Sequence, residues 1–201
     1  YEELMTETED LVRAVALAHR SGKLWAGRDI DAIAPFLRIT VARAFERFAG
    51  LSREAMLALA AADEDRYFRL LVERVEPGLA TLDRPVFLHD YPATQASLAR
   101  SKPGDSQVCE RFELYVGEIE LCNGFGELCD PSEQRARFLA DQAARRVAGK
   151  PVYPIDDRFL AALEDGMPEA SGNALGLDRL VACLAGADTI ADVMAFPHER
   201  L

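Results

Sequence analysis

The 201-residue sequence predicts an α+β fold, in which helices pack against a mostly antiparallel sheet. Residues 110–130 alternate apolar and polar side chains, turn at Gly117 and alternate again, which is typical of two antiparallel strands joined by a tight connection. Residues 1–80 instead carry apolar side chains at helical spacing, bounded by capping residues and glycines. We therefore expect the hairpin near the centre of the sheet, with helices around it.

The first predicted helix spans residues 2–20, because four of its apolar residues fall on one stripe at helical spacing. These residues are Leu4, Leu11, Val12 and Val15. Trp25 follows in what we expect to be a loop bounded by glycines. Residues 36–39 (FLRI) are a candidate short strand or a lead-in to the next helix.

Three further helices are predicted from their N-terminal caps, which are Thr40, Ser52 and Asp63. The side-chain oxygens of these residues can accept hydrogen bonds from the first free backbone N–H groups of a helix. Gly50 is expected to end the first of the three, and Pro77 with Gly78 the last. We interpret the apolar residues of these helices as buried core.

The second half of the chain adds a strand candidate at residues 84–90 (RPVFLHD), ahead of the hairpin. Asp130 then provides an N-cap, followed by a proline and, three residues on, a glutamate that completes a capping box. This helix is expected to reach about Val147. A shorter helix is expected to begin after Asp156 and to stop at Gly166.

The alternation in the hairpin assigns its side chains to two faces of the sheet. On the first strand, one face is predicted to hold Phe112, Leu114 and Val116, and the other Glu113 and Tyr115. On the second strand, Ile119 and Leu121 are expected to point away from Glu118, Glu120 and Cys122. Asn123 and Gly124 are expected to break the pattern.

Four carboxylates and one amide gather on this hairpin, namely those of Glu113, Glu118, Glu120, Glu127 and Asn123. Because antiparallel sheets commonly have one solvated face, the first interpretation is a solvated surface. The second is a cleft, in which so many like charges need a divalent metal or the ammonium of a ligand. The hairpin alone leaves both interpretations open.

Residues 171–197 form a second candidate ligand-binding segment, because glycines stand directly before a predicted helix. The helix is expected to start near Leu177, to end at Gly186, and to bury Leu180, Val181 and Leu184. Arg179 lies in its first turn, where a guanidinium can bind a phosphate with two donors. Such glycine-rich turns also serve packing alone, so this segment by itself does not establish a ligand site.

Composition narrows the class of protein. The net charge of −11 argues against a broad nucleic-acid-binding surface, which needs clustered Lys and Arg. The four cysteines show no CxxC pattern and no zinc spacing, so we expect reduced, mostly buried thiols in a cytoplasmic protein. We expect no membrane span, because no apolar run reaches the required length.

Together the two segments carry a specific resemblance. ERFELY at 110–115, EIELCNGFGEL at 118–128, GNALGLDRL at 172–180 and a terminal AFP resemble the class II lysyl-tRNA synthetase family. Within it, YPATQASL at 91–98 and Ala174 are most similar to the paralogues that attach β-lysine to a lysine of elongation factor P. The resemblance is strong over residues 85–201 and loose over residues 1–84.

The resemblance implies that ATP activates lysine or β-lysine as an adenylate, with Mg²⁺, before transfer to elongation factor P. It implies that Glu113 and Glu120 hold Mg²⁺ and the ATP phosphates, with Leu121 and Gly176 against the nucleotide. Arg179 would grip the terminal phosphate, so Arg179 and Glu120 are the residues expected to act in catalysis. No protein nucleophile is required, because the carboxylate of the amino acid attacks ATP.

Three residues are implied for the amino-acid pocket. Glu127 would pair with the substrate ammonium, and Asn123 would hydrogen-bond its polar atoms. Ala174 stands where lysyl-tRNA synthetases usually have glycine, and its methyl group is expected to disfavour α-lysine relative to an isomer with a displaced amine.

The sequence departs from the family in one respect, because the family's first two motifs normally lie upstream of the region matched here. We therefore expect one partial class II catalytic domain, with a mostly helical insertion at 1–80 and the sheet and third-motif helix at 84–201. The full-length form is expected to be a homodimer that does not use tRNA. Two alternatives stay open: the C-terminal portion of a lysyl-tRNA synthetase, and a truncated paralogue that binds without catalysing.

Overall fold

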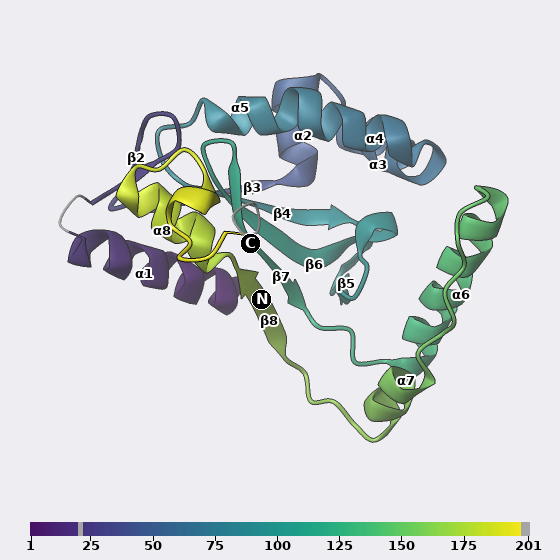
Figure 1. Ribbon diagram of the computed structural model, residues 1–201. Helices are drawn as coiled ribbons and strands as arrows, with labels where there is room; N and C mark the ends of the chain where they lie inside the picture. The colour runs from purple at the N-terminus through teal and green to yellow at the C-terminus, as the bar shows by residue number, and fades with distance from the viewer. Residues whose placement is uncertain (20–21, 198–201) are drawn as a thin grey trace.

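The computed structural model describes residues 1–19 and 22–197, and it confirms the α+β fold (Figure 1). A six-stranded sheet has the order β3-β4-β6-β7-β8, with β5 paired to β6. Only the β3–β4 pair is parallel, and the other pairs are antiparallel. The strands are β3 (Leu37–Thr40), β4 (Val86–Pro92), β5 (Ser101–Lys102), β6 (Asp105–Val116), β7 (Ile119–Gly126) and β8 (Ser171–Leu175).

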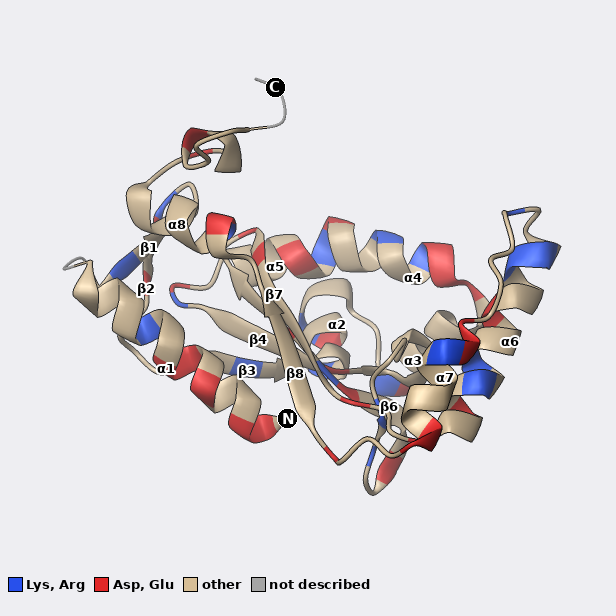
Figure 2. Ribbon diagram, turned by 60° about the horizontal axis from the view of Figure 1, so that its bottom comes forward, with Lys and Arg blue, Asp and Glu red and all other residues tan. Residues whose placement is uncertain are grey.

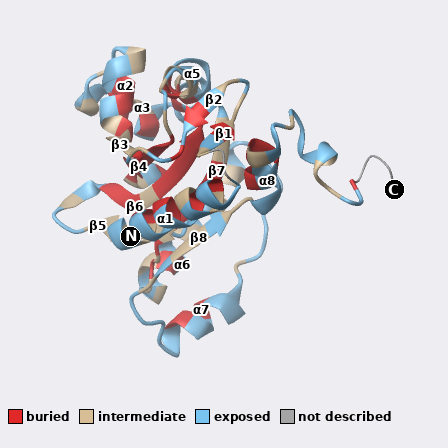
Figure 3. Cartoon of the chain, turned by 90° about the vertical axis from the view of Figure 1, so that its left-hand side faces the viewer, coloured by how far each residue is buried: buried red, intermediate tan, exposed pale blue. Residues whose placement is uncertain are grey.

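Helices cover both faces of this sheet. One face carries α1 (Glu2–Ala18), α8 (Leu177–Ala185) and a small hairpin of β1 (Lys23–Trp25) and β2 (Asp29–Asp31). The other carries α2 (Val41–Ala49), α3 (Arg53–Ala62), α4 (Glu64–Leu70), the π-helical η1 (Leu71–Val75) and α5 (Glu76–Ala80). The central strands are therefore buried on both sides, as Figure 3 shows for β4 and β6.

The remaining elements are η2 (Ala93–Gln95), α6 (Pro131–Val147), α7 (Asp157–Glu164) and η3 (Ile190–Asp192). α6 and α7 stand apart from the two helical layers, beside the end of the sheet that carries β5 (Figure 1). They contact each other and connect β7 to β8.

The predicted helix caps are confirmed by their hydrogen bonds. The side chains of Thr40, Ser52 and Asp63 accept from the backbone N–H groups of the first turns of α2, α3 and α4. Asp130 and Asp156 do the same for α6 and α7. These local bonds satisfy donors that a helix cannot satisfy internally, which explains why the starts were predictable.

Two details of the N-terminal segment differ from the prediction. Leu11 is 51% exposed, and the buried face of α1 runs through Met5, Thr8, Glu9, Val12 and Ala16. Val12 is buried and Leu4 and Val15 pack against the core as predicted, so the prediction was wrong for Leu11 alone, whose burial was assigned from hydropathy. Trp25 lies in strand β1 rather than in a loop, and it pairs with Asp29.

Pro77 and Gly78 do not end the helical segment, which continues through α5 to Ala80. A π-helical turn precedes Pro77, and Pro77 occupies one of the first two positions of α5. The π-helical turn replaces the regular α-helical hydrogen-bond pattern just before this proline. In α8, Val181 is 47% exposed rather than buried. Ala182 and Cys183 take part in packing instead.

The hairpin is confirmed, but its second strand does not break at Asn123. β7 continues to Gly126, and the register shifts between Leu114 and Tyr115. Tyr115 pairs with Glu120 and Leu114 with Cys122, so Leu121 is the extra residue of a bulge. Cys122 therefore shares the face of Leu114, not that of Glu120 as predicted, since one inserted residue reverses the alternation that follows.

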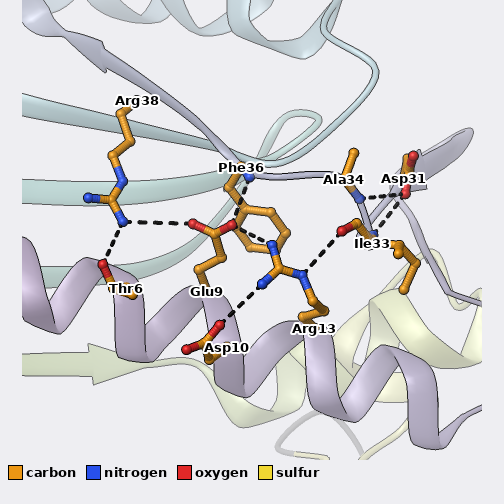
Figure 4. Close-up of polar contacts among 9 residues, drawn as sticks. All are labelled: Thr6, Glu9, Asp10, Arg13, Asp31, Ile33, Ala34, Phe36 and Arg38. Carbon is orange, nitrogen blue, oxygen red and sulfur yellow. Dashed lines mark hydrogen bonds and ion pairs between the residues drawn. The ribbon is translucent and has the colours of Figure 1, made fainter.

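Glu9 joins α1 to the segment that leads into β3 (Figure 4). Its carboxylate accepts from the backbone N–H of Phe36 at 3.0 Å and from Arg13. Arg38 lies on its other side, with Nη2 3.8 Å from Oε2. Glu9 is 8% exposed, so its charge depends on these donors.

We predict that Glu9→Ala lowers the free energy of unfolding by about 1–3 kcal/mol, because it leaves the buried Phe36 N–H without an acceptor. Urea denaturation measures the change. Asp10→Ala is the matched control, because Asp10 also pairs with Arg13 but is solvent-exposed, and it is expected to cost less than about 0.5 kcal/mol. Equal effects of the two substitutions would contradict the role assigned to Glu9.

Candidate functional site

The bulge in the β6–β7 hairpin brings a set of polar side chains onto one face of the sheet. Glu120 stands opposite Tyr115, and Asn123 stands opposite Glu113. On the next strand, Ala174 stands opposite Asn123. Directly paired residues of antiparallel strands share a face, so these five side chains belong to one surface.

Glu113 is the most enclosed member of this surface, at 7% exposure. Its Oε2 accepts from the hydroxyl of Tyr91 at 2.6 Å and from that of Tyr115 at 2.7 Å. Its Oε1 accepts from Arg111 Nη2 at 2.7 Å. The interpretation of the glutamates as a wholly solvated surface is thus wrong for Glu113, whose two oxygens are satisfied inside the protein.

Arg111 is a site residue that sequence reasoning missed. Besides Glu113, it donates from Nε to Asn123 Oδ1 at 3.4 Å and from Nη1 to the carbonyl of Gln95 at 3.0 Å. Its guanidinium lies over the ring of Tyr91, 4.5 Å from the centroid. The signal was available, because Arg111 precedes Glu113 by two residues and so shares its face.

Arg179 and Glu120 meet at this surface, although they are 59 positions apart in the sequence. Arg179 Nη1 lies 3.9 Å from Glu120 Oε2 and donates to the Glu120 carbonyl. Both side chains line a cavity of about 380 Å³ together with Glu76, Tyr115, Glu118 and Ile119. The two segments singled out by sequence therefore close on one cavity.

The electrostatics of the cavity favour a ligand that brings positive charge, because three glutamates line it with one arginine. Burial raises the pKa of Glu120, and the neighbouring Glu113 raises it further, while Arg179 opposes the shift. Burial, with a contribution from Glu113, also raises the pKa of Glu76. Charge on these carboxylates is therefore costly until another cation enters.

Glu76 was not predicted as a site residue. It comes from α5, within the segment that the sequence identified only as helical core, and it accepts from Tyr115 at 3.3 Å. Only the packing of α5 against β6 brings it to the cavity, so no local pattern could have identified it.

The predicted amino-acid pocket lies along β7 and β8. A Cβ at Gly172 would fall 2.4 Å from Glu127 Oε1, so the Glu127 carboxylate lies directly over Gly172. Gly172 pairs with Phe125 and hence shares the face of Asn123 and Ala174. Burial raises the pKa of Glu127. The glycine thus makes room for a carboxylate beside the predicted pocket.

Leu121 and Gly176, both predicted to lie against a nucleotide, are joined through their backbones. The Gly176 N–H donates to the Leu121 carbonyl at 2.9 Å. The Leu121 side chain is buried in the core beneath α1 and α8, so only its backbone is available to a ligand. Gly176 packs against Arg179, whose Cδ would lie 3.3 Å from a Cβ at that position.

The fit of a divalent metal depends on Glu120. Glu113 already accepts hydrogen bonds at both oxygens. Within residues 1–19 and 22–197, no group of three or more His, Cys, Asp or Glu side chains could hold a metal ion. Mg²⁺ commonly needs only one or two carboxylates, because substrate phosphates and water complete its coordination. The site thus fits Mg²⁺ together with a nucleotide rather than alone.

All four cysteines are free thiols, as expected. Burial raises the pKa of Cys109 and Cys183 to about 11 and that of Cys122 to about 12, so these thiols are not activated nucleophiles. Among the described residues, no helix has the length and apolar character needed to cross a membrane.

We predict that Arg179→Met raises the pKa of Glu120 further, because Arg179 is the cation that most strongly favours the charged form of this carboxyl. A pH titration of side-chain carboxyl ¹³C shifts measures this. The folded-state pKa of Glu120 is already above the ordinary value, so its contribution to stability is lost as the pH rises through the folded-state pKa. The substitution is expected to move this loss of stability to higher pH. Arg158→Met, at an exposed residue of α7, is the control. An unchanged or lower pKa would contradict the pairing.

Comparisons with known proteins show the family of the chain. A family model described as tRNA synthetases class II (D, K and N) matches residues 1–200. The elongation factor P–(R)-β-lysine ligase of Proteus mirabilis is 52% identical over 131 residues, which are 65% of this chain and 40% of that protein. The proteins of the same name from Klebsiella pneumoniae and Vibrio cholerae are 50% and 48% identical over 139 residues, 69% of this chain in each case and 42% and 43% of those proteins.

The matched segment spans about two-fifths of the length of these relatives. The family match covers nearly the whole chain, and the polar face of its antiparallel sheet meets Arg179 at one cavity. The chain belongs to the class II tRNA synthetase family.

Proposed function

We propose that this chain forms part of an ATP-dependent ligase that activates lysine or β-lysine as an adenylate and transfers it to a lysine of elongation factor P. The observation that carries the proposal is the meeting of Glu120 and Arg179 at one cavity. The names of relatives that are about 50% identical supply the substrate and the acceptor.

In this proposal Arg179 binds the terminal phosphate of ATP. Its present partner is Glu120, at 3.9 Å, and a phosphate would replace a weak contact with a charge-assisted bidentate one. Glu120, and Glu113 if its hydrogen bonds rearrange, would hold Mg²⁺, which supplies neutralisation of phosphate charge when bound. The remaining task of the protein is to orient ATP.

Glu127 and Asn123 would hold the amino acid, Glu127 by its ammonium and Asn123 by its polar atoms. Arg111 would keep the Asn123 amide oriented through its hydrogen bond to Oδ1. The substrate carboxylate then attacks the α-phosphorus of ATP, forming the mixed anhydride and releasing pyrophosphate. The amine of the acceptor lysine attacks the carbonyl carbon, an amide forms, and AMP leaves.

We predict that the chain binds Mg²⁺-ATP and that Arg179→Ala weakens this binding at least about tenfold, since a charge-assisted phosphate contact is worth about 1.5–3 kcal/mol. Isothermal titration calorimetry measures the affinity, and Arg158→Ala serves as the control. Mass spectrometry of elongation factor P incubated with the chain, ATP, Mg²⁺ and β-lysine tests transfer. ATP binding without pyrophosphate exchange would favour a non-catalytic module, and charging of tRNA with lysine would favour a lysyl-tRNA synthetase.

Ala174 provides a prediction on selectivity. Its side chain is exposed on the face of Asn123, so its methyl group limits the space beside the predicted pocket. Ala174→Gly is expected to increase the use of α-lysine relative to β-lysine in pyrophosphate exchange. Ala170→Gly, just before β8, is the control. No gain in α-lysine use would contradict the assignment of Ala174.

A further inference from the structure

A groove of about 690 Å³ lies between α6 and the segment that follows β4. Residues of η2 with Ser97 and Leu98 form one wall, α6 forms the other, and Arg111 of β6 also lines it. This is the end of the sheet where α6 stands apart from the two helical layers (Figure 1). The proposed adenylate chemistry does not use this groove.

The two arginines that line the groove donate hydrogen bonds to backbone carbonyls of one wall. Arg137 of α6 donates from Nη1 to the carbonyls of Ser97 at 3.0 Å and Ala99 at 2.6 Å. Arg111 donates from Nη1 to the Gln95 carbonyl at 3.0 Å. These bonds tie both walls together and leave the two guanidinium groups engaged. The groove is therefore shaped in advance, and its arginines are poorly placed to grip a phosphate backbone.

The side-chain oxygen of Gln134 is a polar atom beside the groove that has no hydrogen-bond partner among the described residues. Its side chain lines the groove and is 1% exposed. Within the described part of the chain, its Oε1 is buried and accepts no hydrogen bond. A buried acceptor without a donor costs free energy, so an N–H or ammonium group arriving here would be favoured.

The free charges of the groove are negative. Glu64 and Asp141 both line it and both are exposed. Among the residues that the structure describes, the side chain of Glu64 accepts one neutral amide hydrogen bond, from Gln95 Nε2 at 3.2 Å. Their carboxylates would attract a cationic side chain and repel phosphates. As Figure 2 shows, blue residues lie both near α7 and at the other end of α6, and of the four arginines of this helix only Arg137 lines the groove.

Arg111 links this groove to the predicted amino-acid pocket, because the same guanidinium that lines the groove contacts Asn123 and Glu113. We propose that the groove between η2 and α6 docks the lysine-bearing segment of the protein acceptor, with backbone N–H groups at Gln134 and the positive charge near Glu64 and Asp141. This rests on the proposed function, which supplies the acceptor, and adds where the acceptor binds.

The test uses the whole chain and elongation factor P of Proteus mirabilis as the probe. Titration of the ¹⁵N-labelled chain is expected to shift the Gln134 side-chain amide and the backbone signals of residues 94–98. Ala140→Trp, which fills the groove from an exposed position of α6, is expected to weaken binding at least about tenfold. Ala143→Trp is the matched control, because Ala143 is exposed on the same helix outside the groove.

A charge change gives a second, independent variant. Asp141→Lys is expected to weaken the binding of elongation factor P, whereas Asp165→Lys, the same change at an exposed residue outside the groove, is expected to leave it unchanged within about twofold. Both groove variants should retain the affinity of the parent chain for Mg²⁺-ATP, because neither residue lines the nucleotide cavity.

Three results would overturn the docking proposal. One is wild-type affinity for elongation factor P in Ala140→Trp and Asp141→Lys. Another is the absence of binding, or binding whose shifts map to other elements. The third is a stronger response of the same signals to tRNA than to elongation factor P. In each case, intact ATP binding with sensitivity to Arg179→Ala would leave the proposed nucleotide site standing, so the two failures are distinguishable.

Discussion

A single bulged residue decides the arrangement of the candidate site. Leu121 is extra in β7, and it restores Glu120 and Asn123 to the same face of the sheet. Without it, strict alternation would place these two side chains, three positions apart, on opposite faces. With it, Tyr115, Glu113, Glu120 and Asn123 form one continuous polar surface. The Leu121 side chain meanwhile fills the core on the opposite side.

The carboxylates of Glu113 and Glu120 on this surface have different surroundings. Glu113 is enclosed and satisfied by two tyrosine hydroxyls and Arg111, which makes it a fixed part of the framework. Glu120 is partly open and lies beside Arg179, and burial together with Glu113 outweighs the arginines that favour its charge. The difference separates a positioning role from a ligand-binding role. It also explains why the cavity suits a ligand that brings cations and phosphates together.

The helical layer contributes more than coverage of the sheet. α5 supplies Glu76 to the nucleotide cavity, α4 supplies Glu64 to the groove, and Arg111 connects the two regions through its bonds to Glu113 and Gln95. A guanidinium with donors in several directions can hold three elements at once. The candidate site and the groove are therefore one connected polar system on one side of the sheet.

The sequence by itself determined the helix starts, the hairpin and the glycine-preceded helix, because caps, turns and alternation depend on neighbouring residues. It also predicted a candidate site of Glu113, Glu120, Asn123, Glu127, Ala174, Gly176 and Arg179, through two motifs that resemble a known family. Only the tertiary structure decided the bulge at Leu121, the burial of Glu113 and the participation of Arg111 and Glu76. Those features depend on register and on packing between distant segments, which no local pattern encodes.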